Sequence, residues 1–489
     1  MKMMKQRWTR LAAASIALGL TACGGSGGSD EPQAEETRAH DSRVFTALTP
    51  DAKTFAALAA ANDPVDLSTT SRWAGLMPSG AAYRVEVPQN WNGKLVMFAH
   101  GYAGVGDKLV AQDPPIRRHL LRNGYAWAAS SYTKNFYDVR AGIEDTNDLA
   151  LAFNTIAAAN SRTLAKPSRV YIIGTSMGGH VAAAAVEAEA LRTTNHKMKY
   201  DAAMPMCGPV GDTELFNIMA GMQMSAQAMT GYANTPMAQW HTIADKVIPA
   251  LFSTYPATPG LGVPMAMTSP LGMQYASVIK NLTGGERPMF AQALAFGGSL
   301  SLPFGSLGSD GTIDGILNKN VLDTTRLSYV IDGNPEATAQ LNAAVQKVTA
   351  APDANRLRRD GLRWIPQVNG EFSVPVVSIH TLGDLYVPFG MQQLYRKRAQ
   401  AHGNDRLLVQ RVMRGVSHCD FTVAEMTESF DALVKWESDG VKPAGDDVLT
   451  PATVAAPTYG CTYTRAAEQG EPAAALRNPA ASLAPCPAG

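Results

Sequence analysis

A serine flanked by glycines is the residue of this chain best suited to covalent chemistry. Ser176 lies in the pentapeptide Gly-Thr-Ser-Met-Gly at 174–178, directly after the apolar, β-branched run at 170–173. A strand that ends in Gly-x-Ser-x-Gly and continues into a helix is typical of a nucleophile elbow, a tight turn that exposes the serine Oγ. The pattern therefore indicates nucleophilic acyl transfer at Ser176. The alternative is an ordinary strand-to-helix turn with a buried serine.

A serine nucleophile needs a histidine to accept its proton and a carboxylate to orient that histidine. In sheets of this kind the order along the chain is serine, acid, histidine. Asp384 comes a few residues after the apolar run at 374–379, and His418 follows the run at 406–412. We therefore expect Ser176, Asp384 and His418 to meet at the carboxyl edge of one sheet. The alternatives are a turn aspartate and a surface or capping histidine.

Two backbone N–H groups must also face the oxyanion that forms during acyl transfer. The residue after the nucleophile, Met177, supplies one, and Tyr102 in the glycine-containing loop at 99–104 supplies the other. His100 in this loop is interpreted as structural. The loop lacks the lysine of a phosphate-binding loop, and no metal-ligand spacing or dinucleotide motif occurs. We therefore expect neither a metal nor a cofactor.

Strand-like and helix-like segments alternate from about residue 80 to 207, which predicts an α/β domain with a mostly parallel sheet. The alternating run at 83–87 predicts an edge strand, whereas the continuous apolar run at 94–99 suits a strand covered on both faces. Asp113 and Pro114 predict the start of a helix that Gly124 ends. The remaining elements expected here are strands at 125–130, 169–173 and 202–206 and helices at 141–160 and after Ser176.

The alternation stops at residue 209 and resumes at about 373, which predicts a largely helical cap inserted into the sheet domain. The expected divisions are a first core part at 44–208, the cap at 209–372, a second core part at 373–445 and a tail at 446–489. Eleven of the 21 methionines lie between 201 and 300. Six cap side chains could line a pocket for an apolar acyl group or simply form the cap core: Phe216, Met219, Met222, Met224, Met229 and Trp240.

The first 22 residues have the features of a bacterial export signal. A basic stretch precedes the apolar run at 11–20, which is too short to span a bilayer. Residues 20–23 resemble a lipobox, with Cys23 as the lipidated residue, and residues 23–43 predict a flexible tether. Gly24 favours the outer membrane by resemblance to known lipoproteins. The alternative is an ordinary signal peptide cut near Ala22, with a periplasmic or secreted product.

Charge is balanced over the whole chain, with 42 Lys and Arg against 42 Asp and Glu. Without a basic run, the sequence offers no electrostatic basis for nucleic-acid binding. We therefore expect no nucleic-acid partner, and the expected partners are a substrate of the acyl-transfer site and, through the lipid anchor, a membrane.

Four segments, 98–104, 174–180, 380–388 and 415–438, together resemble the α/β-hydrolase superfamily. The element His-Cys-x-Phe-Thr-x-x-Glu at 418–425 is similar to that of secreted bacterial and fungal esterases. The resemblance covers about 70–210 and 373–445. It implies an α/β-hydrolase sheet, mostly parallel, with a large helical cap inserted after the strand that follows the elbow. It also implies hydrolysis of carboxylic esters, with apolar or aromatic acyl groups or polyester fragments as substrates.

Two other functions stay open at this point. One is a serine peptidase or amidase of the same fold, for which Glu214, Glu286 and Arg287 in the cap are available to bind a peptide terminus. The other is a catalytically inactive hydrolase domain that serves as a binding module. The presence of all three residues, Ser176, Asp384 and His418, argues against the inactive domain.

With Cys23 assigned to lipid, four cysteines remain, which allow three pairings in an oxidising compartment or free buried thiols. Tannases and feruloyl esterases bridge a cysteine after the catalytic histidine to one directly before the serine. Thr175 occupies that second position here, and Cys207 is the nearest substitute. The resemblance thus implies a Cys207–Cys419 bridge. We also expect Cys461–Cys486, which would pin the Pro- and Ala-rich tail.

Overall fold

The computed structural model describes residues 34–48, 53–59, 61–258, 262–483 and 485–486. The predicted signal peptide at 1–22 and the lipidation site Cys23 lie outside these residues. The chain divides into a unit at 1–36 and a unit at 37–489, and the description below concerns the second. This unit begins inside the predicted tether at 23–43, because Arg38 is buried in an ion pair with Asp138, 2.8 Å away, and over the ring of Trp364.

The centre of this unit is an eight-stranded sheet with the order β10-β9-β8-β7-β4-β6-β3-β2. Neighbouring strands from β6 to β10 run parallel, while β3 is antiparallel to both β6 and β2. The predicted mostly parallel sheet is therefore confirmed. The strands are β2 (Ser71–Leu76), β3 (Ala82–Val87), β4 (Lys94–Ala99), β6 (Ala126–Ser130), β7 (Arg169–Thr175), β8 (Ala202–Met206), β9 (Val376–Thr381) and β10 (Leu408–Met413). A separate parallel pair joins β1 (Thr46–Ala47) to β5 (Lys108–Leu109).

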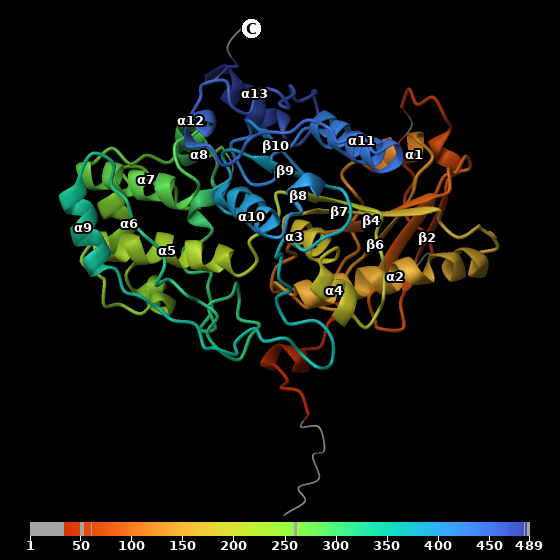
Figure 1. Ribbon diagram of the computed structural model, residues 1–489, viewed down its shortest axis with the longest axis horizontal. Helices are drawn as coiled ribbons and strands as arrows, with labels where there is room; N and C mark the ends of the chain where they lie inside the picture. Colours follow the sequence, from red (N-terminus) through yellow and green to blue (C-terminus); the bar gives the residue numbers. More distant parts are fainter. Residues whose placement is uncertain (1–33, 49–52, 60, 259–261, 484, 487–489) are drawn as a thin grey trace, which may run out of the picture. The chain divides into compact units, whose positions relative to one another are not determined.

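Helices cover both faces of the sheet, which explains why its central strands are apolar throughout. Along β4, Val96 and Phe98 pack toward α1 (Arg117–Arg122) and α11 (Val423–Asp439). Leu95 and Met97 belong to the larger cluster on the opposite face, which α2 (Val139–Ala159), α3 (Met177–Ala184) and α10 (Gly390–Ala401) cover. Figure 1 shows α1 and α11 together on one side of the strands and α2 and α3 on the other.

Two local predictions are wrong. The strand at 83–87 is not at the edge, because β2, which the sequence analysis missed, pairs with it along its whole length. The first helix begins at Arg117 and not at Pro114. The Asp113 carboxylate does not cap it and instead binds the guanidinium groups of Arg84 and Arg117, at 2.7 Å each.

The segment between β8 and β9 forms a cap whose helices lie together to one side of the sheet (Figure 1). Its elements are α5 (Glu214–Met229), η3 (Met237–Thr242), α6 (Ala244–Leu251), α7 (Pro270–Leu282), α8 (Phe290–Phe296), η4 (Ser299–Ser301) and α9 (Pro335–Ala344). Long irregular stretches complete it. Phe216, Met219, Met222, Met224 and Trp240 are buried in its hydrophobic core and Met229 packs against that core. They therefore form the core of the cap, which is the simpler of the two roles considered for them.

The C-terminal segment packs back onto the core domain through a buried ion pair. Arg477 in α13 (Ala474–Leu483) binds the carboxylate of Glu425 in α11 and the backbone carbonyl of Asp420, and both side chains of the pair are almost fully buried. The Cys461–Cys486 disulfide closes the same segment. The remaining short elements are η1 (Ala39–Ser42), η2 (Leu67–Thr69), α4 (Ala188–Thr193), η5 (Asp405–Leu407) and α12 (Pro451–Val454).

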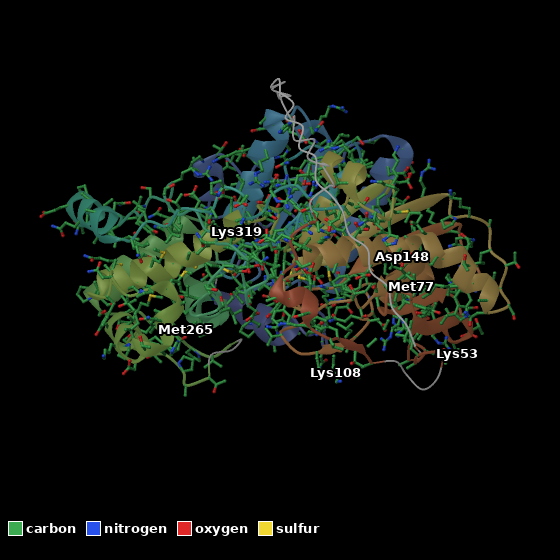
Figure 2. All side chains as sticks on the ribbon, turned by 90° about the horizontal axis from the view of Figure 1, so that it is seen from below. Lys53, Met77, Lys108, Asp148, Met265 and Lys319 are labelled. Carbon is green, nitrogen blue, oxygen red and sulfur yellow. A yellow bond between two sulfur atoms is a disulfide. The ribbon has the colours of Figure 1, made fainter. Side chains whose placement is uncertain are left out.

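Lys53 and Lys108 are exposed and lie toward the lower edge of the view in Figure 2. None of the described helices combines the length and the apolar composition needed to cross a lipid bilayer.

Candidate active site

Ser176 occupies a strained turn between β7 and α3. Its backbone has φ 56° and ψ −124°, a conformation that costs a residue with a side chain of the order of 1–3 kcal/mol. Its N–H donates to the carbonyl of Met206 at 3.0 Å, which ties the turn to β8. A Cβ on Gly174 would lie 2.0 Å from the carbonyl oxygen of Gly178, and one on Gly178 would lie 2.0 Å from that of Ala99. The sequence Gly-x-Ser-x-Gly is therefore required by the close approach of strand and helix.

The structure brings together the three side chains that the sequence pattern singled out. The distance from His418 Nε2 to Ser176 Oγ is 2.7 Å, and that from His418 Nδ1 to Asp384 Oδ2 is 2.6 Å. In this geometry the serine hydroxyl donates to Nε2 while the Nδ1–H donates to the carboxylate. The imidazole can thus take the serine proton, and the carboxylate holds the tautomer that permits it.

Asp384 is held rigidly in the loop after β9. It is completely buried, and its Oδ1 accepts the backbone N–H groups of Tyr386 at 3.0 Å and Val387 at 2.9 Å. These two bonds leave Oδ2 for His418. The ring of Tyr386 stands edge-on to the His418 imidazole, with centroids 5.4 Å apart. The loop therefore orients the histidine from two sides.

The loop that carries His418 is fixed from the sheet and from the cap. Thr381 Oγ1 donates to the carbonyl of Ser417, and Ser417 Oγ donates to the carbonyl of Gly297 in the cap, both at 2.7 Å. Asp420 Oδ2 accepts the N–H of Val416 at 3.0 Å. The structure also contains the Cys207–Cys419 disulfide, which joins this loop to the end of β8.

The loop after β4 passes directly beside the serine. A Cβ on Gly101 would lie 3.8 Å from Ser176 Oγ, so the chain at 101–102 borders the nucleophile. Among the described residues, the hydrogen bonds of the protein use neither the N–H of Tyr102 nor that of Met177. Both amides are therefore available for the predicted oxyanion role. His100 braces the loop, donating from Nδ1 to the carbonyl of Gly101 at 2.7 Å and stacking on Tyr132.

Other histidines are poor candidates for the base. Burial lowers the pKa values of His100, His180 and His380, that of His380 to about 4, so these rings stay neutral. His380 Nε2 donates to the carbonyl of Val387, within the loop of Asp384. His402 pairs with Glu371 at the end of α10.

Two residues that the sequence analysis missed border the site. Tyr386 contacts His418 as described, and Asp314 in the cap accepts a hydrogen bond from the Tyr102 hydroxyl. Tyr386 lies in the segment 380–388, where no pattern marks its own role, and Asp314 lies in no recognisable motif. Asp314 is in an irregular stretch of the cap, so its position depends on tertiary folding alone.

The three cap residues considered for binding a peptide terminus are engaged elsewhere. Glu214 pairs with Arg326, and Glu286 pairs with Lys280. Arg287 is buried behind the loop that carries Asp384, called the acid loop below. Its Nε donates to the carbonyl of Leu382 in this loop at 2.8 Å. This arrangement does not support that assignment.

A cavity of about 710 Å³ opens between the cap and α10, lined among others by Glu214, Asn281 and Lys397. None of the three residues Ser176, Asp384 and His418 lines it, so it does not define a substrate pocket. In the described part of the chain, no group of three or more His, Cys, Asp or Glu side chains is arranged to hold a metal ion.

The strand order, the strained elbow after β7 and the loops that follow β9 and β10 are those of the α/β-hydrolase fold. The two disulfides are those of a protein that folds outside the reducing cytoplasm.

No model of a known protein family matches the chain. It is similar to an o-phthalyl amidase of Xanthobacter agilis, with 24% identity over 423 residues that cover 76% of this chain and 88% of the relative. Among solved structures it is similar to feruloyl esterase B from Aspergillus oryzae, with a TM-score of 0.41 and 13% identity, covering 80% of this chain and 86% of that one. The esterase LipA from Xanthomonas oryzae gives a TM-score of 0.32 and 15% identity, covering 75% and 87%.

Proposed function

We propose that the protein hydrolyses carboxylic esters through an acyl-enzyme on Ser176, with apolar or aromatic acyl groups as substrates. The observation that carries the proposal is the continuous hydrogen-bonded chain from Ser176 Oγ through His418 to the buried carboxylate of Asp384. Such a chain serves to activate a serine, and here it lies at the carboxyl edge of the sheet.

In the proposed mechanism, Ser176 Oγ attacks the ester carbonyl while His418 Nε2 accepts its proton. Asp384 stabilises the imidazolium that results. The N–H groups of Met177 and Tyr102 would bind the oxyanion of the tetrahedral intermediate. His418 then returns the proton to the leaving alcohol, and the same residues activate water to release the acid.

Hydrolysis of p-nitrophenyl esters by the purified protein tests this proposal, with Ser176→Ala as the matched variant. We expect turnover that the substitution lowers about 10⁶-fold in kcat, as in other serine hydrolases that lose their nucleophile. A fluorophosphonate probe should label the parent protein at Ser176. Esterase activity that survives in the Ser176→Ala variant would contradict the mechanism.

A second candidate, hydrolysis of amides, is favoured by the similarity to the o-phthalyl amidase. The same triad would serve, because the two reactions differ mainly in the leaving group that His418 protonates. Turnover of acyl p-nitroanilides alongside the matching p-nitrophenyl esters separates the two. Cleavage of the anilide with no cleavage of the ester would favour the amidase.

We also propose that the protein is exported and anchored through a lipid on Cys23. The lipobox-like sequence at 20–23 and the two disulfides support this. Labelling with a fatty-acid analogue in a bacterial host should mark the parent chain and not a Cys23→Ser variant. Processing near Ala22 without labelling would indicate an ordinary signal peptide.

A further inference from the structure

A loop of the cap brings a carboxylate to the catalytic residues. The Tyr102 hydroxyl donates to Asp314 Oδ2, and Tyr102 follows Gly101, which borders Ser176 Oγ. A second tyrosine, Tyr386, contacts the imidazole of His418 with its ring. Burial and then the nearby charge of Asp314 raise the pKa of Tyr386 to about 12. Asp314 is thus close to two tyrosines that flank the nucleophile and the base.

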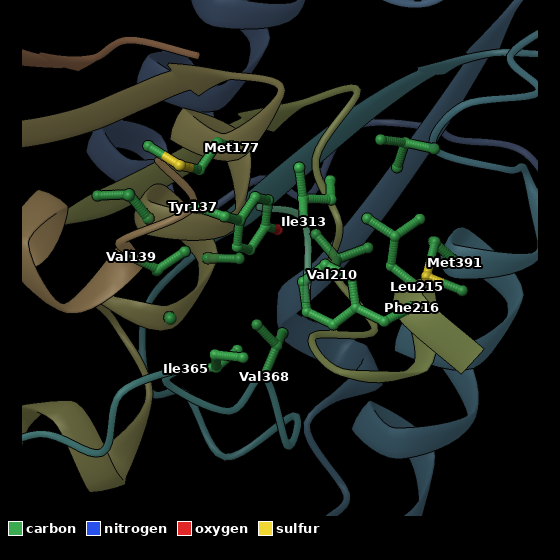
Figure 3. Close-up of a cluster of buried hydrophobic side chains, with 14 of the residues drawn as sticks. Tyr137, Val139, Met177, Val210, Leu215, Phe216, Ile313, Ile365, Val368 and Met391 are labelled. Atoms are coloured by element: carbon green, nitrogen blue, oxygen red, sulfur yellow. The ribbon is translucent and has the colours of Figure 1, made fainter. Parts of the chain in front are cut away.

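The loop holds this carboxylate in a fixed position. The buried Asp310 accepts hydrogen bonds from the N–H and hydroxyl of Thr312, and Gly308 donates to the carbonyl of Thr312 at 2.8 Å. Asp314 has φ 61°, a left-handed conformation that few residues other than glycine, asparagine and aspartate adopt readily. The neighbouring Ile313 belongs to the hydrophobic cluster of Tyr137 and Met177, as Figure 3 shows.

The carboxylate of Asp314 has no basic counterpart among the residues that the structure describes. In the described part of the chain, no lysine, arginine or histidine forms an ion pair with this carboxylate, and Tyr102 is its hydrogen-bonding side chain. The side chain is partly exposed, although Ile313 and Ile316 on either side are buried. A fixed carboxylate with unused acceptor sites attracts a cation or a hydrogen-bond donor and repels an anion.

We propose that Asp314 determines the specificity of the site for the acyl group. Among aromatic acyl groups, it selects those that carry a positive charge or a hydrogen-bond donor, and it discriminates against those that carry a carboxylate. This assignment rests on the proposed acyl transfer at Ser176, and it adds a substrate class that the triad alone does not define.

Three rigid esters test the assignment: p-nitrophenyl benzoate, its 4-aminomethyl derivative and its 4-carboxy derivative. They share the leaving group and the aromatic ring and differ in charge. The quantity measured is the ratio of kcat/KM for the cationic ester to kcat/KM for the anionic one, each corrected for spontaneous hydrolysis. The variant is Asp314→Asn, which keeps an oxygen that can accept the Tyr102 hydroxyl, and thermal melts check that it folds.

We expect the parent enzyme to prefer the cationic ester, and the ratio to fall at least about tenfold in Asp314→Asn, equivalent to about 1.4 kcal/mol. Asp439→Asn, the same change at an exposed position at the end of α11, should leave the ratio as in the parent. A ratio that is equal in the parent and Asp314→Asn would overturn the assignment while leaving acyl transfer intact. If all three esters resist cleavage, the proposed ester hydrolysis fails, but the assignment of Asp314 does not fail with it. The same ratio is then measured with the corresponding p-nitroanilides.

Discussion

Cys419, directly after the histidine that binds Ser176, is joined by a disulfide to Cys207, which lies 212 residues earlier at the end of β8. Both cysteines have positive φ, 46° at Cys207 and 54° at Cys419. The bridge therefore holds two sharp turns against each other at the edge of the sheet. It fixes the position of the histidine loop relative to the elbow.

This relationship predicts that removing the bridge impairs both stability and catalysis. In a Cys207→Ser, Cys419→Ser double variant, we expect the free energy of unfolding to fall by about 2–5 kcal/mol. We also expect kcat to fall more than KM rises, because the loop of His418 loses its connection to β8. Denaturant unfolding and steady-state kinetics measure the two effects.

The Cys461–Cys486 pair supplies the matched control. Its double serine variant should lose stability but keep a kcat much nearer that of the parent, since this bridge lies in the C-terminal segment. Equal losses of kcat in the two double variants would show that the Cys207–Cys419 bridge has no specific link to catalysis.

Asp384→Asn should preserve the fold and remove most of the activity. An asparagine still offers an oxygen to the N–H groups of Tyr386 and Val387, but its amide no longer stabilises the imidazolium. We expect kcat to fall about 10⁴-fold with a small change in KM. Asp353→Asn, at an exposed cap residue, is the control. A loss of less than tenfold in Asp384→Asn would mean that another group orients the histidine.

Glu187 predicts a dependence of stability on pH. It is buried, accepts the N–H groups of Gly370 and Glu371, and burial raises its pKa to about 8. Between its ordinary pKa of 4.5 and about 8, the unfolded chain loses this proton while the folded chain keeps it. The free energy of unfolding therefore falls as pH rises through this range, by on the order of a few kcal/mol from this group.

Urea unfolding of the parent and of Glu187→Gln at several pH values checks this prediction. The variant should show a flatter dependence between about pH 6.5 and 8, above the range in which the raised pKa values of Asp145, Asp420 and Asp446, each about 6, also contribute. Glu336→Gln on the surface of α9 should keep the parent slope. An unchanged slope in Glu187→Gln would contradict the assignment.

Arg287 is expected to act as a positioning residue for the acid loop. Its Nε binds the carbonyl of Leu382, two residues before Asp384, and its guanidinium also donates to Gly285 and Thr283. Arg287→Gln leaves buried acceptors unpaired, so we expect a loss of about 1–3 kcal/mol in stability. Kinetics should show a lower kcat with KM little changed, whereas Arg406→Gln at an exposed position affects neither. A change in KM alone would argue for a role in substrate binding.

The sequence made the positions of Ser176, Asp384 and His418 predictable because each follows a strand with a clear apolar pattern. The order of these strands in the sheet follows from a known fold, and the elbow glycines mark the turn. The antiparallel strand β2 was missed because its residues, 71–76, mix polar and apolar side chains without a simple period. The start of α1 was misassigned because Asp113 forms ion pairs with Arg84 and Arg117 that only the tertiary structure brings within reach.

The cap was predictable as an insertion but not in its contacts. Asp314 lies in an irregular loop whose conformation depends on Asp310, Thr312 and glycines with positive φ, and no periodic pattern marks such a loop. Arg287 is considered above for binding a peptide terminus, because a sequence does not reveal which arginine will be buried against carbonyl groups. Both positions arise from packing between segments far apart in the chain.

Besides Arg287, which donates to the loop of Asp384, the cap contacts the catalytic loops through two acceptors: Gly297 accepts the hydroxyl of Ser417, and Asp314 accepts that of Tyr102. Anyone who builds chimeras by exchanging this insertion with that of another hydrolase would therefore also remove supports of the histidine loop and of the loop beside the nucleophile. A transplanted cap would have to bring its own equivalents of these two acceptors. Redesign at single positions within the existing cap avoids that problem.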